Sequence, residues 1–370
     1  MKIAIDHHPA RTHAPGVGRY SRELARALVR LDGVPADVEL ALTDVGKDKR
    51  TIGEPALGLV GPDVKRTPRV ESSSMGRRMF QTLRRTADGL VGGCDLYHRM
   101  LPDWPPVGKA REAIAVAELF EPGSERDGAL AAVLKRADAF AFSDATAKAL
   151  RERYSLPDER IHKTPVGCDH WLRDLPPDRA KWPEKKDPPQ VLVLGAIHPR
   201  RRPERVLKAI EMLRRERRTV HVLYVGPRTD RSDEFLRDRL GGSVARDQVL
   251  WNPNTSEDAL ARIFATSSAM IHLSEGEETA VTPLEGVAFE LPVLASRIPA
   301  FEEDLTGAAR LLDEAEEADP VALAEALKEA LDGDGDEARA KRRAHAERYT
   351  WAACAEATLA AYRRIVERGR

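Results

Sequence analysis

The sequence contains few cysteines and almost no net charge. Its 370 residues include 3 cysteines, Cys94, Cys168 and Cys354, which are 74 and 186 residues apart. This spacing is too wide for a zinc or redox motif, and the odd number favours a reducing cytoplasm over a disulfide scaffold. With 59 Lys and Arg against 60 Asp and Glu, the formal net charge is -1. A uniformly basic protein that binds nucleic acid is therefore disfavoured.

Long apolar runs are missing as well. No stretch approaches the 18 or more apolar residues expected of a membrane helix. The first apolar run ends at Asp6, which is too early for a signal peptide. A composition of 42% hydrophobic and 32% charged residues is typical of a globular, water-soluble chain. Because single cores rarely grow beyond about 250 to 300 residues, the length predicts two domains.

Two series of alternating strands and helices are separated by a proline-rich segment. The first series opens with a strand at 2–5, and the second with a strand at 191–194 that ends at Gly195. Strands that alternate with helices predict parallel sheets. We therefore expect an α/β protein with two Rossmann-like, doubly wound domains, residues 1–173 and 190–350, joined by a linker at 174–189. Such domains bind ligands at the carboxyl ends of their strands, and we expect the site in a cleft between them.

The segment after a predicted strand at 269–273 is the most informative. Thr282 is followed three positions later by Glu285, with Pro283 between them, which is typical of a capping box and a helix start. Helix N-termini attract anions. Glu277 and Glu285 would then lie beside a phosphate, where carboxylates can accept hydrogen bonds from sugar hydroxyls. In the alternative interpretation, Glu285 only caps the helix and Glu277 is a surface residue.

Basic residues gather in the first part of the second series. Residues 191–250 hold 14 Lys or Arg against 8 Asp or Glu, whereas residues 301–350 hold 7 against 15. The run from Arg200 to Arg202 comes directly after Gly195, where a doubly wound domain has its ligand loops. These arginines are either phosphate ligands or part of a solvated surface.

Several segments, taken in order, resemble family 4 of the retaining glycosyltransferases, which have the two-domain GT-B fold. Glu277, seven intervening residues and Glu285 resemble the family's Glu-x7-Glu signature. The resemblance extends to a phosphate loop, a first glycine loop, the end of the first domain and a C-terminal helix at 351–370 that crosses back onto the first domain. These four features correspond to Gly195-Ala-Ile-His-Pro-Arg-Arg, Gly16-Val-Gly18-Arg-Tyr, Phe142 to Asp169, and Arg348-Tyr-Thr-Trp followed by a helix.

The resemblance implies a retaining transfer of a hexose from a nucleotide-diphosphate sugar, with GDP or UDP as the nucleotide. The acceptor would be a hydroxyl of a glycan, a lipid-linked molecule or a small molecule, with no metal and no other cofactor. Glu277 would contact the donor sugar, and Arg201 replaces the lysine that neutralises the diphosphate. Glu118 is a candidate contact for the acceptor hydroxyl. The remaining expected donor-binding residues are Gly16, Gly18, Gly195, Arg200, Glu278, Thr279, Ala280, Val281, Thr282 and Glu285.

Some positions depart from the family pattern. Ala117 stands where the family commonly has a histidine, Ala196 stands where many members have an arginine, and Glu278 adds a carboxylate beside the expected diphosphate. His98 or His13 are alternative catalytic groups. The second hypothesis is therefore a catalytically impaired homologue that binds nucleotide sugars or acts as a scaffold. A nicotinamide oxidoreductase is a weaker third, because no third glycine follows the first glycine loop.

A basic segment in the first domain has two interpretations. Residues 77–85 place Phe80 and Leu83 between two pairs of arginines, and the segment is either a solvated helix or a contact with an anionic membrane or a lipid-linked acceptor. We accordingly expect a cytoplasmic location, with or without peripheral contact at the inner membrane face. The four arginines are Arg77, Arg78, Arg84 and Arg85.

Overall fold

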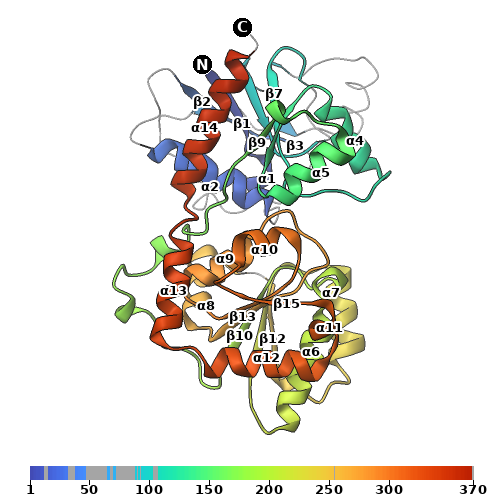
Figure 1. Ribbon diagram of the computed structural model, residues 1–370, viewed down its shortest axis with the longest axis vertical. Coiled ribbons are helices and arrows are strands. Elements are labelled where there is room, and N and C mark those ends of the chain that lie inside the picture. The colour runs from blue at the N-terminus through green and yellow to red at the C-terminus, as the bar shows by residue number, and fades with distance from the viewer. Residues whose placement is uncertain are drawn as a thin grey trace. The chain divides into compact units, whose positions relative to one another are not determined.

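Two compact units make up the chain in the computed structural model. Unit 1 comprises Met1–Gly167 and Trp351–Arg370, and unit 2 comprises Cys168–Thr350 (Figure 1). The structure describes residues 1–11, 16–31, 38–46, 65–66, 70–71, 88–89, 91, 93–102, 107–253 and 255–368. The predicted contact between the membrane and the arginines at 77–85 lies outside these residues, as does His13.

Unit 1 is built on a seven-stranded sheet in the order β4-β2-β1-β6-β7-β8-β9, with a separate pair, β3 and β5. All pairings in these sheets are parallel. The strands are β1 (Lys2–Asp6), β2 (Glu39–Thr43), β3 (Val45–Gly46), β4 (Lys65–Arg66), β5 (Val70–Glu71), β6 (Leu96–Arg99), β7 (Arg111–Ala115), β8 (Asp138–Ala141) and β9 (Ile161–Lys163). The helices are α1 (His8–Arg11), α2 (Val17–Arg30), α4 (Glu125–Leu134), α5 (Asp144–Tyr154) and α14 (Trp351–Glu367), with a short turn η2 (Asp158–Arg160).

The last helix, α14, packs against α2 within unit 1. Trp351, at its start, is buried against Gly167. A Cβ atom at Gly167 would lie 2.4 Å from the backbone nitrogen of Trp351. Only glycine therefore allows the chain to leave unit 1 beside the helix that later returns to it.

His98 is a core residue of unit 1. It lies on β6 with none of its surface exposed, and its Nδ1 is 2.6 Å from the hydroxyl oxygen of Tyr362 on α14. Its ring also packs against the rings of Tyr20 and Phe140. Burial lowers the pKa of His98 to about 3. These contacts give His98 a role in attaching α14 to the sheet, in place of the catalytic role considered above.

The buried histidine predicts that unit 1 loses stability in mild acid. Between about pH 6.5 and pH 3 the unfolded chain binds a proton at His98 that the folded chain excludes, so the free energy of unfolding falls as the pH falls. From pH 7.5 to pH 5.0 we expect His98 to contribute about 2 kcal/mol to this loss. A His98→Asn variant, which does not titrate, should show a correspondingly smaller loss. Hydrogen exchange of the β6 and α14 amides at the two pH values measures the difference, and equal losses in both proteins would contradict the assignment.

Unit 2 contains a six-stranded sheet in the order β12-β11-β10-β13-β14-β15, with every pairing parallel. Its strands are β10 (Gln190–Leu194), β11 (His221–Val225), β12 (Val249–Asn252), β13 (Ala269–His272), β14 (Val293–Ser296) and β15 (Arg310–Leu312). Its helices are α6 (Pro203–Arg215), α7 (Asp230–Phe235), α8 (Glu257–Thr266), α9 (Val281–Ala288), α10 (Pro299–Leu305), α11 (Glu314–Ala318), α12 (Pro320–Asp332) and α13 (Asp336–Ala346). Short turns are η3 (Leu172–Asp174), η4 (Arg179–Lys181), η5 (Pro199–Arg201) and η7 (Arg246–Gln248), and η6 (Leu236–Leu240) is π-helical.

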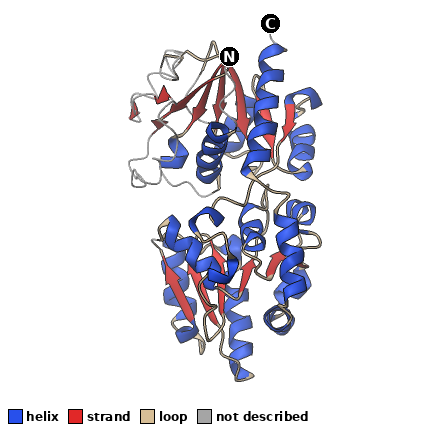
Figure 2. Ribbon diagram, turned by 90° about the vertical axis from the view of Figure 1, so that its left-hand side faces the viewer, coloured by secondary structure: helices blue, strands red, loops and turns tan. Residues whose placement is uncertain are grey.

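The sheet of unit 2 has a hydrophobic core on each face. Successive residues of a strand point to opposite faces. Leu192 and Leu194 of β10 accordingly join a core with side chains of α8, α9 and α10, and Val191 and Val193 join a second core with α6 and α12. Figure 2 shows helices on both sides of the strands. The predicted α/β fold class, with doubly wound parallel sheets, is confirmed.

Residues 174–189, expected to be a linker, lie inside unit 2. Leu175 belongs to the core that contains Phe264 and Phe289, and the ring of Trp182 lies 5.5 Å from that of Phe289. The prolines keep this segment out of regular helices and strands, but its apolar side chains still pack. The chain passes between the units at 167–168 and again at 350–351.

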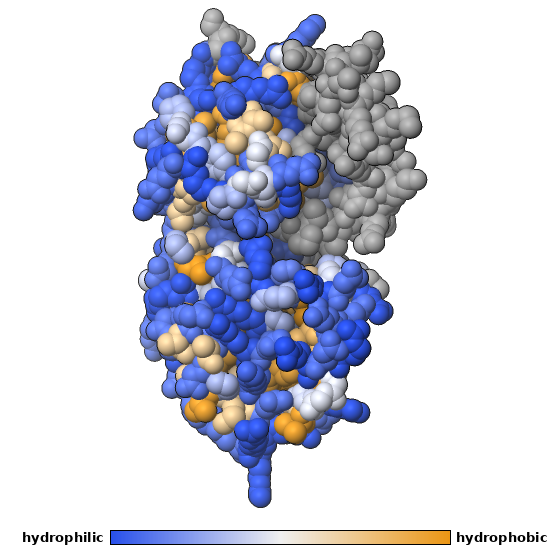
Figure 3. Space-filling model, turned by 90° about the vertical axis from the view of Figure 1, so that its right-hand side faces the viewer, coloured by the Kyte–Doolittle hydropathy of each residue, from blue (hydrophilic) through white to orange (hydrophobic). Residues whose placement is uncertain are grey.

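The surface shown in Figure 3 is mainly hydrophilic, with apolar residues in small, separate patches. Across the described residues, the exposed large hydrophobic side chains are Val244, Leu250 and Val321. No described helix combines the length and apolar character needed to cross a bilayer. All three cysteines lie among the described residues, are buried and form no disulfide.

Candidate functional site

Two loops meet at the carboxyl edge of the sheet in unit 2. They follow β10 and β13, which are neighbouring parallel strands. The backbone N–H of Glu275 donates to the carbonyl oxygen of Arg200 at 3.1 Å, and Nη2 of Arg200 donates to the carbonyl oxygen of Gly276 at 2.8 Å. The basic loop and the acidic loop predicted from the sequence are thus joined at the edge where doubly wound domains bind ligands.

A cluster of three side chains lies where these loops meet. Nη1 of Arg201 donates to Oε1 of Glu277, and Nε2 of His272 lies 2.9 Å from the same oxygen. The side chains of Arg201, Glu277 and His272 are 28%, 17% and 1% exposed. The structure thus brings together Arg201 and Glu277, two predicted site residues that are 76 positions apart in the sequence. It adds His272, which was not predicted.

The charges in this cluster depend on one another. Burial would raise the pKa of Glu277, but His272 and Arg201 outweigh it and lower that pKa to about 2. Burial, together with the charge of Arg201, lowers the pKa of His272. At neutral pH the cluster therefore holds one guanidinium, one carboxylate and one neutral imidazole. It offers both a cation and a hydrogen-bond acceptor to a ligand at the sheet edge.

Two glycines allow the basic loop to leave the sheet. Gly195 has a φ of 127°, which L side chains rarely adopt, and its N–H donates to the carbonyl oxygen of Val225 at 2.8 Å. On the neighbouring strand end, a Cβ atom at Gly226 would lie 2.1 Å from the carbonyl oxygen of Gly195. Gly195 was predicted as a site residue. Gly226 was not predicted as a site residue, because its contact with Gly195 depends on the pairing of β10 with β11.

The helix of the acidic loop begins earlier than the capping box predicted. Helix α9 starts at Val281 with Ala280 as its N-cap, and the N–H of Leu284 donates to the carbonyl oxygen of Ala280 at 2.9 Å. Thr282 is therefore already helical, and no side chain caps this helix. Pro283 fits at its third position because the N–H groups of the first turn have no partner inside the helix. The predicted capping box at Thr282 and Glu285 is wrong.

Glu285 contacts a histidine instead. Its Oε1 lies 3.2 Å from Nε2 of His170, and both side chains are completely buried. His170 also packs on Trp171, with ring centroids 4.4 Å apart. Glu285 is thus neither a helix cap nor a surface residue. The signal for its burial is its position on the inner face of α9, between Leu284 and Ala288, both of which are core residues.

The other predicted residues are placed as follows. In unit 2, Glu278, Thr279 and Thr282 are half-buried, and Ala280 and Val281 are buried. In unit 1, Gly16 has a φ of 70° and is the N-cap of α2, Gly18 is buried in that helix, and Glu118 follows the end of β7. Oε2 of Glu118 lies 3.5 Å from Nη1 of Arg126.

In the described part of the chain, no group of three or more His, Cys, Asp or Glu side chains is arranged to hold a metal ion.

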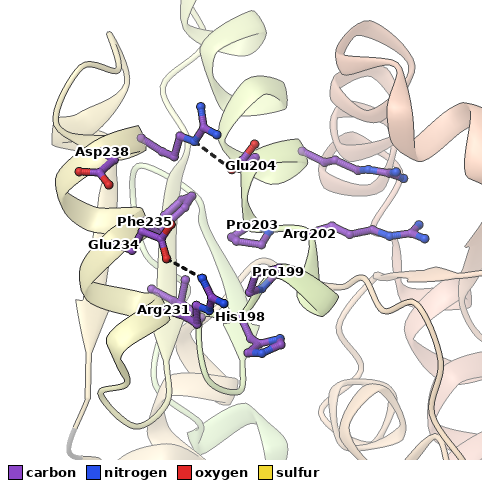
Figure 4. Close-up of a pocket in the computed structure, with 12 residues that line it drawn as sticks. His198, Pro199, Arg202, Pro203, Glu204, Arg231, Glu234, Phe235 and Asp238 are labelled. Atoms are coloured by element: carbon purple, nitrogen blue, oxygen red, sulfur yellow. Dashed lines mark hydrogen bonds and ion pairs between the residues drawn. The ribbon is translucent and has the colours of Figure 1, made fainter. Parts of the chain in front are cut away.

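A cavity of about 380 Å³ lies on another side of the basic loop, between α6 and the segment of α7 and η6 (Figure 4). Its apolar lining includes Ile197 and Phe235, and Glu204 of α6 pairs with Arg239 of η6 at 3.0 Å. Arg231, also in the lining, pairs with Glu234 at 2.9 Å. The lining of this cavity thus combines apolar side chains with paired charges of both signs.

Comparison with solved structures identifies the fold. A sucrose-phosphate synthase from Thermosynechococcus elongatus aligns over 100% of both chains with a TM-score of 0.69 and 18% identity. WaaG, a glycosyltransferase involved in lipopolysaccharide biosynthesis, aligns over 98% of both chains with a TM-score of 0.67 and 16% identity. The chain has the GT-B fold.

Residues 175–348 match the family described as glycosyl transferases group 1. This segment makes up just under half of the chain and contains the whole Arg201, His272 and Glu277 cluster. A serotype-specific mannosyltransferase WbdA from Escherichia coli is 29% identical over 115 residues, which is 31% of this chain and 14% of that protein. A D-inositol 3-phosphate glycosyltransferase from Arthrobacter sp. (strain FB24) is 26% identical over 256 residues, which is 67% of this chain and 60% of that protein. The chain thus spans less than two thirds of the length of either relative.

Proposed function

We propose that this protein is a retaining glycosyltransferase that moves a hexose from a nucleotide-diphosphate sugar to a hydroxyl acceptor. The observation that carries the proposal is the cluster of Arg201 and Glu277 at the carboxyl edge of β10 and β13, next to the N-terminus of α9. A cation, a carboxylate and free helix amides in one place match a ligand that has both phosphates and sugar hydroxyls.

In this proposal each part of the cluster has one task. Arg201 and the first amides of α9 hold the diphosphate and stabilise the charge that develops as the nucleotide leaves, which is electrostatic catalysis. Glu277 accepts hydrogen bonds from hydroxyls of the donor sugar. Glu285, whose side chain is buried against His170 in this structure, binds the ribose once it has released that contact. The similarity to mannosyltransferases of Escherichia coli favours mannose as the transferred sugar, and GDP-mannose is the donor that we propose.

A titration of the pure protein with UDP-, GDP- and dTDP-hexoses tests the donor site. We expect one nucleotide class to bind, and we expect Glu285→Ala to weaken that binding by about 10-fold or more, because a buried hydrogen bond to a charged group contributes about 1.5–3 kcal/mol. Glu302→Ala on the exposed face of α10 is the matched control and should bind as the wild type does. Absence of binding for all three classes would contradict the proposal.

A second candidate is a homologue that binds the donor without turnover. It is favoured by Ala117, which follows β7 and has no side chain that can transfer a proton, and by the extra carboxylate of Glu278. Incubation of the bound donor with glycan and lipid-linked acceptors separates the two candidates. Product with the nucleotide released supports the transferase, and binding without product supports the second candidate.

A further inference from the structure

The contact between Arg201 and Glu277 has a consequence for the proposed donor site. Both side chains are assigned to the donor, yet in this structure Nη1 of Arg201 donates to Oε1 of Glu277. A diphosphate that binds the Arg201 guanidinium must draw it away from this carboxylate. Glu277 is only 17% exposed, so a carboxylate that lost its hydrogen-bond donors there would be strongly destabilised.

His272 supplies a second hydrogen bond to the same oxygen. Its Nε2 lies 2.9 Å from Oε1 of Glu277, and its ring, which is 1% exposed, lies 5.6 Å from the ring of Phe301. Nε2 also contacts Nη1 of Arg201, and a guanidinium can only donate. Because the ionised carboxylate is the stronger acceptor of the two neighbours, we assign the proton of Nε2 to the bond with Glu277 and the proton of Nη1 to the same oxygen. The imidazole is held by the end of β13 and by the core, whereas Arg201 extends from a short turn and is more exposed. Arg201 is therefore the partner that is free to move.

Building on the proposed function, we propose that His272 is a positioning residue, which keeps Glu277 oriented toward the donor sugar while Arg201 exchanges that carboxylate for the donor diphosphate. Before the donor binds, the ion pair between Arg201 and Glu277 keeps both side chains at the site. After the exchange, the buried carboxylate keeps the Nε2–H of His272 and the side-chain hydroxyl of Ser274 as hydrogen-bond donors.

The exchange changes the charge around His272 in a known direction. The charged groups that face His272 are Arg201 from η5, Glu277 from the loop after β13 and Glu285 from α9. Arg201 lowers the pKa of His272, and the two glutamates raise it. When Arg201 is neutralised by a diphosphate, its effect on His272 weakens and the pKa of His272 rises. A charge within 4–6 Å shifts a pKa by about 1–3 units, so we expect a rise of about 1 unit.

Nitrogen NMR of the full chain, labelled with ¹⁵N-histidine, tests this inference with UDP and GDP as probes. His272 is assigned by comparison with His272→Gln. We expect the Nε2–H tautomer in the free protein and a rise of about 1 unit in its titration midpoint when the nucleotide is bound. His221, at the amino end of β11 and thus at the opposite edge of the sheet, serves as the internal reference and should not respond.

Each outcome of this measurement decides a different point. If calorimetry shows that a nucleotide binds but His272 does not respond, or if His272 carries its proton on Nδ1, the positioning role is wrong and the proposed donor site still stands. If neither UDP nor GDP binds, the proposed function and the positioning role fail together.

Two variants separate positioning from a purely structural role. His272→Gln keeps an amide donor at the end of the side chain, and His272→Leu removes it. In the Leu variant we expect GDP and UDP to bind as in the wild type, but the additional affinity for GDP-mannose or UDP-glucose to fall about 10-fold or more. The Gln variant should keep most of this additional affinity. Equal losses in both variants, or weaker binding of the nucleotides themselves, would overturn the positioning role.

Discussion

Replacing Arg201 by alanine is expected to weaken the binding of UDP or GDP by about 10- to 150-fold. A hydrogen bond to a charged group contributes about 1.5–3 kcal/mol, which corresponds to this range. Arg201 is held at the sheet edge by η5, where its N–H donates to the carbonyl oxygen of His198 at 2.8 Å. Its guanidinium already contacts a carboxylate, so it lies where a diphosphate can replace that carboxylate. Isothermal titration calorimetry at low and high salt measures the effect.

The controls for this prediction separate charge from shape. Arg201→Lys keeps the charge but loses the planar fork, so its affinity should lie between those of the wild type and the alanine variant. Arg214→Ala removes an exposed arginine that pairs with Asp247, and it should bind as the wild type does. Added salt should weaken binding less in Arg201→Ala than in the wild type. Equal affinities of the wild type and Arg201→Ala would exclude Arg201 from the phosphate site.

The largest effect on stability is expected from Glu112→Ala in unit 1. Glu112 lies on β7 with 2% of its side chain exposed, and its Oε2 accepts from Nε of Arg99 at 2.8 Å. Arg99, on β6, is 1% exposed, so the variant removes the carboxylate that neutralises a buried guanidinium. Breaking a buried pair from one side costs about 3–5 kcal/mol. Urea unfolding, followed by hydrogen exchange of the β6 and β7 amides, should show a loss of this size.

A matched control exists because Glu112 has a second partner. Nε of Arg136 lies 2.7 Å from Oε1 of Glu112, but the Arg136 side chain is 52% exposed. Arg136→Ala should therefore cost only about 0–1 kcal/mol, as for other solvent-exposed pairs. The double variant Arg99→Met with Glu112→Leu should recover much of the loss, because apolar side chains can replace a buried pair. A loss in Arg136→Ala as large as in Glu112→Ala would show that burial does not control the effect.

The elements of unit 2 were largely predictable because their sequence patterns are local. The strand predicted at 191–194 corresponds to β10 (Gln190–Leu194), and the strand predicted at 269–273 corresponds to β13 (Ala269–His272). Both faces of a parallel sheet are buried, so its strands are continuous apolar runs that stand out between helices. The predicted start of α9 was wrong. Thr282 and Glu285 have the spacing of a capping box, but the N-cap is Ala280 and the helix begins at Val281.

The site was predictable only in part. Arg201 and Glu277 were found because each follows a predicted strand, and the carboxyl ends of parallel strands lie along one edge. His272 ends β13 and has no motif around it, so only its contact with Glu277 reveals its role. His170 and Gly226 were missed for the same reason, because their partners, Glu285 and Gly195, are distant in the sequence.

The sequence by itself determined the alternation of strand and helix, the doubly wound class and the two charged loops, because each depends on periodicity, turn residues or charge within a short segment. Only the tertiary structure decided that Arg201 and His272 contact the same carboxylate oxygen of Glu277. It also decided that Glu285 is buried against His170 and that His98 is a core residue. These outcomes depend on which strands are neighbours and on how deeply each side chain is buried. Burial lowers the pKa of His98, and burial together with the charge of Arg201 lowers the pKa of His272, so the chemistry of these two histidines follows from packing and not from residue type.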